Sequence, residues 1–416
     1  MISYHASWVV PIGAKPIRDG QVDIERGRVV DVRAGEAGRA GGAGRAVEQD
    51  LGNVILMPGL VNAHTHLELS HLRGVVAPAS SFVAWVRELL AARRGYPDPR
   101  DPVILRGAAD AIEEAVRTGT AVVGDISNTL ITFELLARSR LSAVLFYELI
   151  GFNLENPDAF VERAVDELRA LRPMDSVRPA LAAHAPYSVA RRLFRAIREA
   201  TEHHQLGPHS VHLAESAEEI QFIREAVGPW RTLLEELGAW EPSWRAPGVS
   251  PVEYLDDNGF LRGAIVVHGV QMSADDLAHV AARGATLVTC PRSNAYTGAG
   301  TPPVERFYAS GVRVAVGTDS LTSTPDLNMF SELAAMRALA PAVPASRLLD
   351  SATRQGATAL GFEADYGSIE PGKRGRLLAV APGIHLTEAL DVEEYLVSGI
   401  QPDQISWIER FGDRTC

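Results

Sequence analysis

The pair His64 and His66 is the first feature of the sequence that could do chemistry. When two residues stand two apart in an extended segment, their side chains project to the same side. Two imidazoles on one side make half of a metal site, because neutral imidazole is a good ligand for zinc and iron and a carboxylate can complete the set. The alternative is a pair of satisfied polar residues in a turn. Because the pair follows the apolar run 54–61, we predict that it closes a strand.

Further polar residues stand at or just past the ends of later apolar runs. They are His184, His212, His268 and Asp319. If the runs are parallel strands of one barrel, their carboxyl ends converge on the face where such barrels build active sites. His212 and Asp319 are then the natural third and fourth metal ligands. A metal with an open position would lower the pKa of water toward neutrality.

Glu215 lies three residues after His212. If the chain turns helical there, Glu215 can point into the same mouth, where a carboxyl group could act as general acid and proton shuttle. The alternative is a carboxylate that merely starts a helix, since Glu is favoured in a first turn. Asp319 could take the proton from water, and His268 could orient that water or polarise the substrate. The predicted catalytic residues are therefore Glu215, His268 and Asp319.

The other reactive side chains are interpreted without a catalytic role. Cys290 follows an apolar run and could be a thiol nucleophile, but beside a metal site we interpret it as structural. His71 and His209 are near the site in sequence and are also expected to have no role. Surface or packing positions are expected for His5, His203, His204, His279 and His385.

Apolar runs alternate with amphipathic stretches through the middle of the chain. Strands that alternate with helices imply parallel βαβ units, and eight of them fit a closed (β/α)8 TIM-type barrel. A long open sheet is the alternative. The runs are 54–61, 121–125, 143–146, 179–185, 210–213, 264–268, 286–289 and 312–316, and the stretches include 82–94, 102–118, 156–171 and 190–203.

Both ends of the chain are rich in short β-type segments. Residues 8–12, 20–24 and 29–32 near the start, and the run 377–380 after the turn-rich segment 367–373, predict a small β-sandwich domain built from both termini. The predicted domains are residues 1–55 plus 365–416, and a catalytic barrel over 56–364. Residues 35–44 are interpreted as a loose loop, and 226–250 as an insertion that could form a lid.

Composition limits the class of partner. The chain has 416 residues and a formal net charge of −12, so nucleic acids and anionic membranes are not expected to bind. A small nucleoside-like ligand needs no basic surface and is the expected partner; a homodimer stays open. Two cysteines give no disulfide framework and no Cys-based zinc motif. Without a signal segment or an apolar run of about 18 residues, we expect a cytoplasmic protein.

Several motifs, in this order, resemble those of the amidohydrolase superfamily. The segment 57–66, MPGLVNAHTH, resembles its opening motif. HLAE at 212–215, VHG at 267–269, CPRSN at 290–294, GTDS at 317–320 and GSIEPGK at 367–373 resemble later motifs. The set covers nearly the whole chain and points to the branch of cyclic-amidine deaminases and triazine chlorohydrolases. One departure is GRL at 375–377, where that superfamily usually has Ala-Asp-Leu.

The resemblance implies a (β/α)8 barrel with one divalent metal, zinc in preference to iron. By its pattern the ligands would be His64, His66, His212 and Asp319. Glu215 and His268 would handle protons, and His184 would bind substrate. Relatives with two metals carry a carboxylated lysine at the end of strand four, where this sequence reads AHAP at 183–186, so one metal is expected.

The segment 64–70, HTHLELS, is similar to a subgroup that deaminates 6-amino-6-deoxyfutalosine in a menaquinone pathway. Glu68 could there bond a ribose hydroxyl or a ring N–H, or it could orient a histidine. The expected reaction is hydrolytic deamination of an aminated purine nucleoside, giving futalosine and ammonia. Alternatives are deamination of adenosine-type thioethers or guanine, and dechlorination of a triazine. A non-catalytic metal-binding scaffold is the alternative from another class.

Overall fold

The computed structural model describes residues 1–35 and 47–408. It separates into two compact units, which are described one at a time. One contains residues 62–114 and 123–327, and the other contains residues 1–61, 115–122 and the chain from Asn328 onward. The predicted loop over 35–44 lies outside the described residues except for Gly35.

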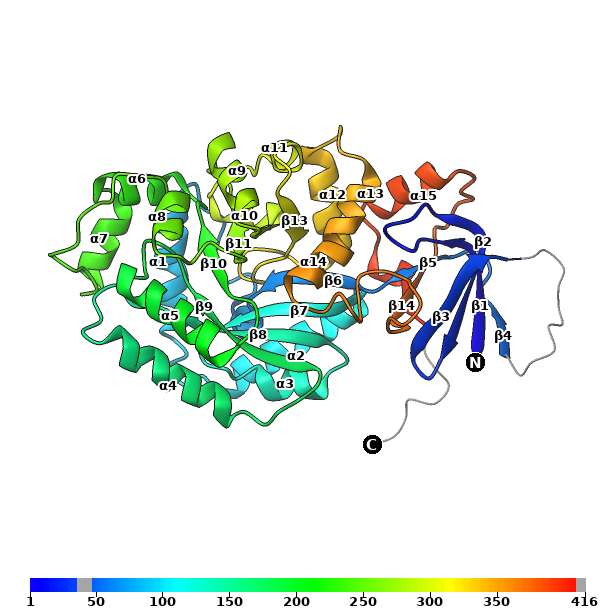
Figure 1. Ribbon diagram of the computed structural model, residues 1–416, viewed down its shortest axis with the longest axis horizontal. Helices are drawn as coiled ribbons and strands as arrows, with labels where there is room; N and C mark the ends of the chain where they lie inside the picture. Colours follow the sequence, from blue (N-terminus) through cyan, green and yellow to red (C-terminus); the bar gives the residue numbers. More distant parts are fainter. Residues whose placement is uncertain (36–46, 409–416) are drawn as a thin grey trace. The chain divides into compact units, whose positions relative to one another are not determined.

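Eight parallel strands form the larger sheet, in the order β13-β12-β11-β10-β9-β8-β7-β6. A bridge between Thr65 and Asp319 joins its two outer strands, so the sheet is a nearly closed barrel. This confirms the predicted fold class. The strands (Figure 1) are β6 Leu60–Thr65, β7 Thr120–Ser127, β8 Ser142–Leu149, β9 Val177–Ala183, β10 Ser210–Leu213, β11 Ile265–His268, β12 Thr286–Thr289 and β13 Arg313–Val316.

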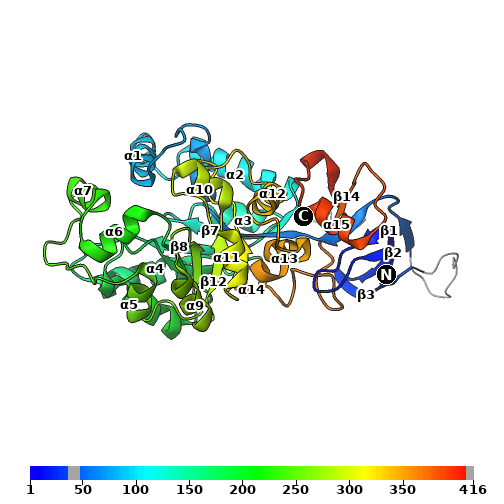
Figure 2. The same ribbon diagram turned by 90° about the horizontal axis from the view of Figure 1, so that it is seen from above.

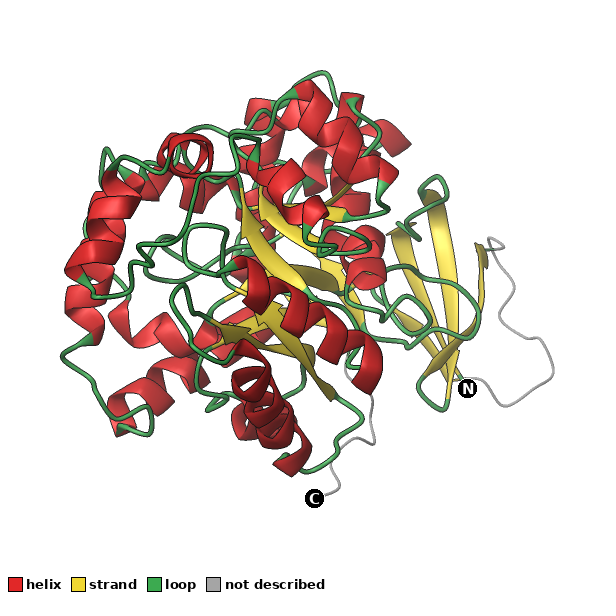
Figure 3. Ribbon diagram, turned by 60° about the vertical axis from the view of Figure 1, so that its left-hand side comes forward, coloured by secondary structure: helices red, strands yellow, loops and turns green. Residues whose placement is uncertain are grey.

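Helices surround these strands, as Figure 3 shows. Figure 2 places α1 and α2 on one side of the strands and α4, α5 and α9 on the opposite side. They are α1 Phe82–Arg93, α2 Pro102–Arg117, α3 Phe133–Arg138, α4 Pro157–Ala170, α5 Arg191–His204, α6 Ala217–Glu225, α7 Pro229–Glu236, α8 Pro251–Asp257, α9 Ala274–Ala282, α10 Pro291–Thr297 and α11 Val304–Ala309, with the 3₁₀ helix η1 Leu67–Leu72.

Local sequence explains where these helices begin. The side chain of Asn156 caps α4 by accepting a hydrogen bond from the backbone N–H of Ala159, and Pro157 fills the first helical position, where no N–H is needed. In α5 the residues Leu193, Phe194 and Ile197 recur at helical spacing and are buried, while Arg195 between them is exposed.

The apolar run 54–61 is divided between two sheets, which differs from the single barrel strand predicted for it. β5 Ile55–Pro58 belongs to the other sheet, and β6 begins at Leu60. Gly59 is the residue between the two strands. A glycine fits there because a Cβ at this position would lie only 2.7 Å from the Cβ of Ala121. His64 consequently lies inside β6, and His66 is the first residue beyond it.

The second sheet draws its strands from both termini. Its order is β15-β14-β5-β1-β2-β3, and β4 pairs with β1. Tyr4, Val22, Leu56 and Leu377 pack together in its core. The predicted domain boundaries at residues 55 and 365 stay a prediction. The strands are β1 Ile2–Val9, β2 Ile17–Glu25, β3 Arg28–Ala34, β4 Val47–Asp50, β5, β14 Leu377–Val380 and β15 Ile405–Trp407.

The remaining helices belong to the C-terminal part of the chain. They are α12 Met329–Leu339, α13 Ala345–Asp350, the π-helical turn η2 Ser351–Gln355, α14 Gly356–Ala359, α15 Ala389–Leu396 and η3 Pro402–Gln404. Among all described helices, none is both long and apolar enough to cross a membrane.

The predicted insertion 226–250 contains α7 and is packed by aromatic rings. Trp230 stacks on Tyr187 with 3.6 Å between the ring centroids, and it also contacts Phe82 of α1. Farther along, Trp244 stacks on Phe222 of α6 at 5.0 Å. These contacts hold the insertion against elements that follow other barrel strands.

Candidate metal centre and active site

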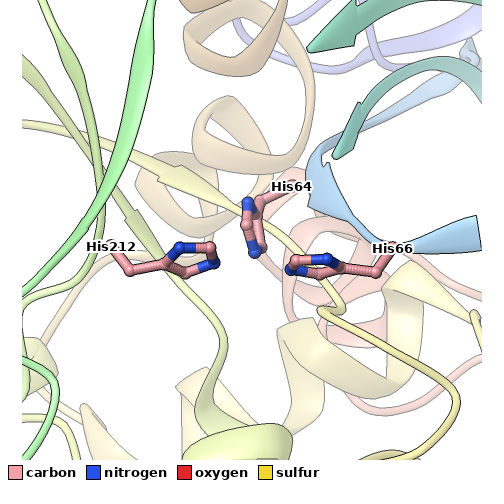
Figure 4. A group of neighbouring side chains, drawn as sticks. All are labelled: His64, His66 and His212. Carbon is pink, nitrogen blue, oxygen red and sulfur yellow. The ribbon is translucent and has the colours of Figure 1, made fainter. Parts of the chain in front are cut away.

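Three imidazoles from two strands point toward one another. Figure 4 shows His64 and His66 facing His212, which comes from β10. One nitrogen from each of the three rings lies within 4.8 Å of the others. Parallel strands place their carboxyl ends at one face of a barrel, which explains how residues almost 150 positions apart in sequence meet.

Asp319 completes this cluster. Its Oδ1 lies 3.5 Å from Nε2 of His66 and 3.6 Å from Nε2 of His64. Its Oδ2 accepts a hydrogen bond from Ser293 at 2.5 Å, which fixes the carboxylate. Asp319 has a φ of 61°, a strained value for a residue with a side chain, and its N–H donates to the carbonyl of His64. β13 and β6 thus hold the carboxylate beside the two imidazoles.

Burial sets the charges in this cluster. Removal from water lowers the pKa of His66 well below its ordinary value, and the neighbouring His64 lowers it further, so its imidazole is neutral. Burial alone would raise the pKa of Asp319, but the contact with His64 and the nearby His66 keep it well below its usual range. Neutral imidazoles and an ionised carboxylate are the forms that bind a divalent metal.

The orphaned ring of His64 tests whether a metal fits here. Among the described residues, neither of its two buried nitrogens has a hydrogen-bond partner, although buried polar groups in folded proteins are nearly always bonded. His212 donates through Nδ1 to the carbonyl of His184 at 3.0 Å, which leaves its Nε2 lone pair available. Three imidazole nitrogens and one carboxylate oxygen suit zinc or ferrous iron. The four residues therefore fit the predicted metal.

Glu148, which the sequence reading missed, stands beside the cluster. It lies in β8, with Oε1 3.4 Å from Nδ1 of His212 and Oε2 accepting from Asn128 at 2.8 Å. Together with His184 and His212 it forms a second group of atoms close enough to hold a metal. If Glu148, His184 and His212 held the metal, Nδ1 of His212 would lose its hydrogen bond to the carbonyl of His184. The set of His64, His66, His212 and Asp319 is therefore the better metal site. The predicted run 143–146 ended before Glu148, which is why its strand-end position went unnoticed.

Glu215 is the second residue after β10 and is buried. Burial, together with the negative charges of Asp319 and Glu219, raises its pKa well above the ordinary value for Glu. Its Oε2 lies 3.5 Å from Nε2 of His268. Burial therefore favours the protonated form of this carboxyl group, which can act as an acid.

Glu219 in α6 fixes the turn that aims Glu215. Its two carboxylate oxygens accept the backbone N–H groups of Ala214, at 2.9 Å, and of Glu215, at 3.0 Å. Ala214 has a φ of 50°, a value that residues with side chains rarely adopt. The buried carboxylate holds this strained turn in place, a role that spacing in the sequence does not reveal.

His268 and His184 are each oriented by a neighbour. The side-chain amide of Asn294 donates to Nδ1 of His268 at 3.0 Å, so the ring proton resides on Nε2, toward Glu215. Nδ1 of His184 lies 2.5 Å from the hydroxyl of Ser188. Burial lowers the pKa of His184 to about 4, with a smaller effect from the charge of Arg93, so this ring is neutral.

Glu68 lies to one side of the cluster, with its carboxylate already bonded. It accepts hydrogen bonds from the hydroxyl of Ser127, the backbone of Asn128 and the hydroxyl of Thr129 at 2.6, 3.0 and 2.8 Å. These contacts tie η1 to the segment that follows β7. Substrate binding by Glu68 stays a prediction, as does the structural role of Cys290, which is buried where α10 begins.

Asp125 anchors the chain just after the His64 and His66 pair. It is fully buried and accepts hydrogen bonds from the N–H of Leu67, at 2.9 Å, and from the hydroxyl of Thr132, at 2.6 Å. Burial raises its pKa from 3.8 to about 7, which the two hydrogen bonds only partly oppose. The folded protein therefore binds a proton that the unfolded chain releases.

We expect this carboxyl to make stability depend on pH. The contribution of Asp125 to the free energy of unfolding is fully present below pH 3.8 and is lost as the pH rises through about 7. The loss amounts to at most about 4 kcal/mol. Thermal unfolding measured from about pH 4 to pH 8 should show a smaller decline in Asp125→Asn than in the wild type. Glu113→Gln, which changes an exposed carboxylate, should keep the wild-type slope; an unchanged slope in Asp125→Asn would contradict the assignment.

Comparison of the sequence with known proteins identifies its family. Residues 55–402 match the amidohydrolase family. An aminodeoxyfutalosine deaminase from Deinococcus radiodurans is 34% identical over 76% of this chain and 75% of its own length. A 5-methylthioadenosine/S-adenosylhomocysteine deaminase from Teredinibacter turnerae is 28% identical over 91% of this chain and 83% of its own length.

A solved structure shows the same fold over nearly the whole chain. The crystal structure of the Helicobacter pylori aminofutalosine deaminase in complex with methylthio-coformycin superposes with a TM-score of 0.83 and 26% identity. The match covers 96% of this chain and 97% of that one. The chain therefore belongs to the amidohydrolase family and is a hydrolytic deaminating enzyme within it.

Proposed function

We propose that this enzyme uses one zinc ion to remove the 6-amino group from the adenine ring of 6-amino-6-deoxyfutalosine, releasing futalosine and ammonia. The observation that carries the proposal is the buried Glu215, whose pKa is raised by burial, beside His268 and next to the cluster of three imidazoles and Asp319. The similarity to aminofutalosine deaminases supports the choice of substrate. This reaction would place the enzyme in menaquinone biosynthesis.

The metal would be held by His64, His66, His212 and Asp319. When bound, it supplies a Lewis acid that makes water a nucleophile at neutral pH. We assign one ion, because the strand-four end carries His184 where relatives with two metals have a lysine. His184 is neutral and half-buried, so it can bond the substrate without adding charge.

Glu215 is the proton donor in this proposal. Addition of water at C6 of adenine places electrons on the neighbouring ring nitrogen, N1, and a proton must arrive there as the C–O bond forms. A carboxyl group whose protonated form is favoured by burial can deliver that proton. The ring loses its aromatic stabilisation at C6, and the amino group becomes the group that can leave.

Asp319 and His268 complete the proton transfers. Asp319 keeps an ionised carboxylate in a buried site, so it can accept the proton of the attacking water. The same proton then goes to the amino group, which leaves as ammonia, while the hydroxyl proton that remains at C6 returns to the carboxylate of Glu215 as the carbonyl forms. His268 presents its Nε2–H toward the reacting centre, since Asn294 occupies Nδ1, and this N–H can bond the oxygen that adds to C6.

Deamination of S-adenosylhomocysteine or 5′-methylthioadenosine is the second candidate. It is favoured by relatives of that activity that match more than nine-tenths of this chain. All of these substrates share the adenine ring and differ at the 5′ end. The residues around Glu215 act on the shared ring and do not distinguish them.

A substrate panel tests the proposal. Zinc-loaded enzyme should deaminate 6-amino-6-deoxyfutalosine with a kcat/KM at least about tenfold above the values for S-adenosylhomocysteine, 5′-methylthioadenosine and adenosine, a difference of about 1.4 kcal/mol. Loss of adenine absorbance and release of ammonia are the measurements. A higher kcat/KM for either thioether would favour the second candidate, and turnover of none of the four would contradict adenine deamination altogether.

A further inference from the structure

A cavity of about 520 Å³ opens beside Glu68. η1, the end of α1 and the start of α2 bound it, with Leu237 from the insertion on another side. Leu69, Leu90 and Ile104 give it apolar walls, and the ring of Tyr96 adds a flat surface. Such a lining suits the apolar body of a ligand.

Two adjacent arginines at the end of α1 line the same cavity. Arg93 contacts the side-chain oxygen of Asn128 at 3.3 Å and lies 3.7 Å from the carboxylate of Glu68. Arg94 is exposed, and within the described part of the chain its guanidinium pairs with no carboxylate. One carboxylate thus faces two guanidinium groups, which leaves an excess positive charge on a chain whose net charge is −12.

The cavity is connected to the reaction centre by side-chain contacts. Glu68, in its wall, stands two residues after His66 and bonds the backbone of Asn128. The amide of Asn128 donates to Glu148, whose other oxygen lies 3.4 Å from His212. The cavity therefore adjoins the cluster through Glu68.

We propose that this cavity receives an apolar 5′ group that ends in a carboxylate, and that Arg94, assisted by Arg93, binds that carboxylate. The inference rests on the proposed function and narrows its substrate class. A guanidinium can bind a carboxylate through two parallel hydrogen bonds, and aliphatic and aromatic walls favour a benzoate over a hydrated amino acid. 6-Amino-6-deoxyfutalosine ends in a benzoate, S-adenosylhomocysteine in an amino acid, and 5′-methylthioadenosine in a methyl group.

The test compares an acid with its methyl ester. Zinc-loaded wild-type enzyme should prefer 6-amino-6-deoxyfutalosine to its methyl ester by about tenfold in kcat/KM, which is what a hydrogen bond to a charged group is worth. Arg94→Gln should remove this preference by raising KM for the acid, with kcat within about twofold, because the group lies away from Glu215. The double variant Arg93→Gln/Arg94→Gln should do the same.

Arg87→Gln is the matched control, because Arg87 is also on α1 but pairs with Glu236 and does not line the cavity. It should keep the full preference for the acid. If neither the single nor the double variant lowers the acid-to-ester ratio, the inference is wrong.

A binding measurement separates this failure from failure of the proposed function. Benzoate alone can be titrated into the zinc-loaded wild type and into Arg94→Gln by calorimetry, with no turnover needed. Weaker binding to the variant supports the subsite even if the nucleoside is not a substrate. Equal binding to both proteins, or binding to neither, overturns it.

Discussion

Replacing Glu215 by glutamine is expected to abolish deamination and to leave the bound metal in place. The amide keeps the size of the side chain but has no proton to give to the ring nitrogen, so kcat should fall by at least about a thousandfold. Glu215 is buried, and its Oε2 lies 3.5 Å from Nε2 of His268. It is not one of the four residues of the metal cluster, so metal content should be unchanged.

The pH profile adds a second test of the same role. Because burial raises the pKa of Glu215 well above the ordinary value for Glu, its carboxyl group should stay protonated to a higher pH than an exposed Glu. Wild-type kcat should therefore fall as the pH rises through this raised pKa. That limb should be missing from any residual activity of Glu215→Gln.

Glu218→Gln is the matched control, because Glu218 is in the first turn of α6 but accepts a hydrogen bond from Ser81 at 3.1 Å. It should retain wild-type kcat. More than a tenth of the wild-type kcat in Glu215→Gln would rule out the assigned proton transfer. Loss of zinc together with activity would instead make Glu215 part of the metal site. Turnover by the wild type also separates an enzyme from the non-catalytic scaffold considered at first.

The barrel was predictable because its apolar runs alternate with helical patterns, and β10 and β12 match the predicted ranges. The run 54–61 was assigned to one strand because periodicity cannot distinguish two buried strands that follow one another. What separates β5 from β6 is the close approach of the chain at Gly59 to Ala121. That contact exists only after the sheets have formed.

The parallel-strand rule was enough to bring the predicted site residues together, since each stands at a strand end. It did not find Glu219 or Asn294, which lie on helices after the strands and act through hydrogen bonds to Glu215 and His268. Glu68 shows the reverse case: its place after the histidine pair suggested the substrate, whereas its carboxylate bonds the segment after β7. Hydrogen-bond partners depend on side-chain direction, which spacing does not determine.

Removing the metal should abolish activity and also destabilise the fold. His64 is buried with both ring nitrogens unpaired, and each unpaired buried polar group costs roughly 1–3 kcal/mol. A metal present at a thousand times its Kd stabilises the folded state by about 4 kcal/mol. Treatment with a chelator should therefore lower Tm by on the order of 5–10 °C, and added zinc should restore both Tm and turnover.

Substitution of a metal ligand should also abolish activity and lower Tm, but added zinc should then restore neither. His66→Ala removes one imidazole, so turnover should be lost, zinc measured by mass spectrometry should fall well below one per chain, and added zinc should not restore Tm. His209→Gln is the control, because this histidine bonds the carbonyl of Phe260 at 2.9 Å and belongs to neither group of candidate metal ligands. It should keep its zinc and its response to the chelator. If His66→Ala binds zinc as the wild type does, the metal is held by other residues, and the group of Glu148, His184 and His212 becomes the site to test.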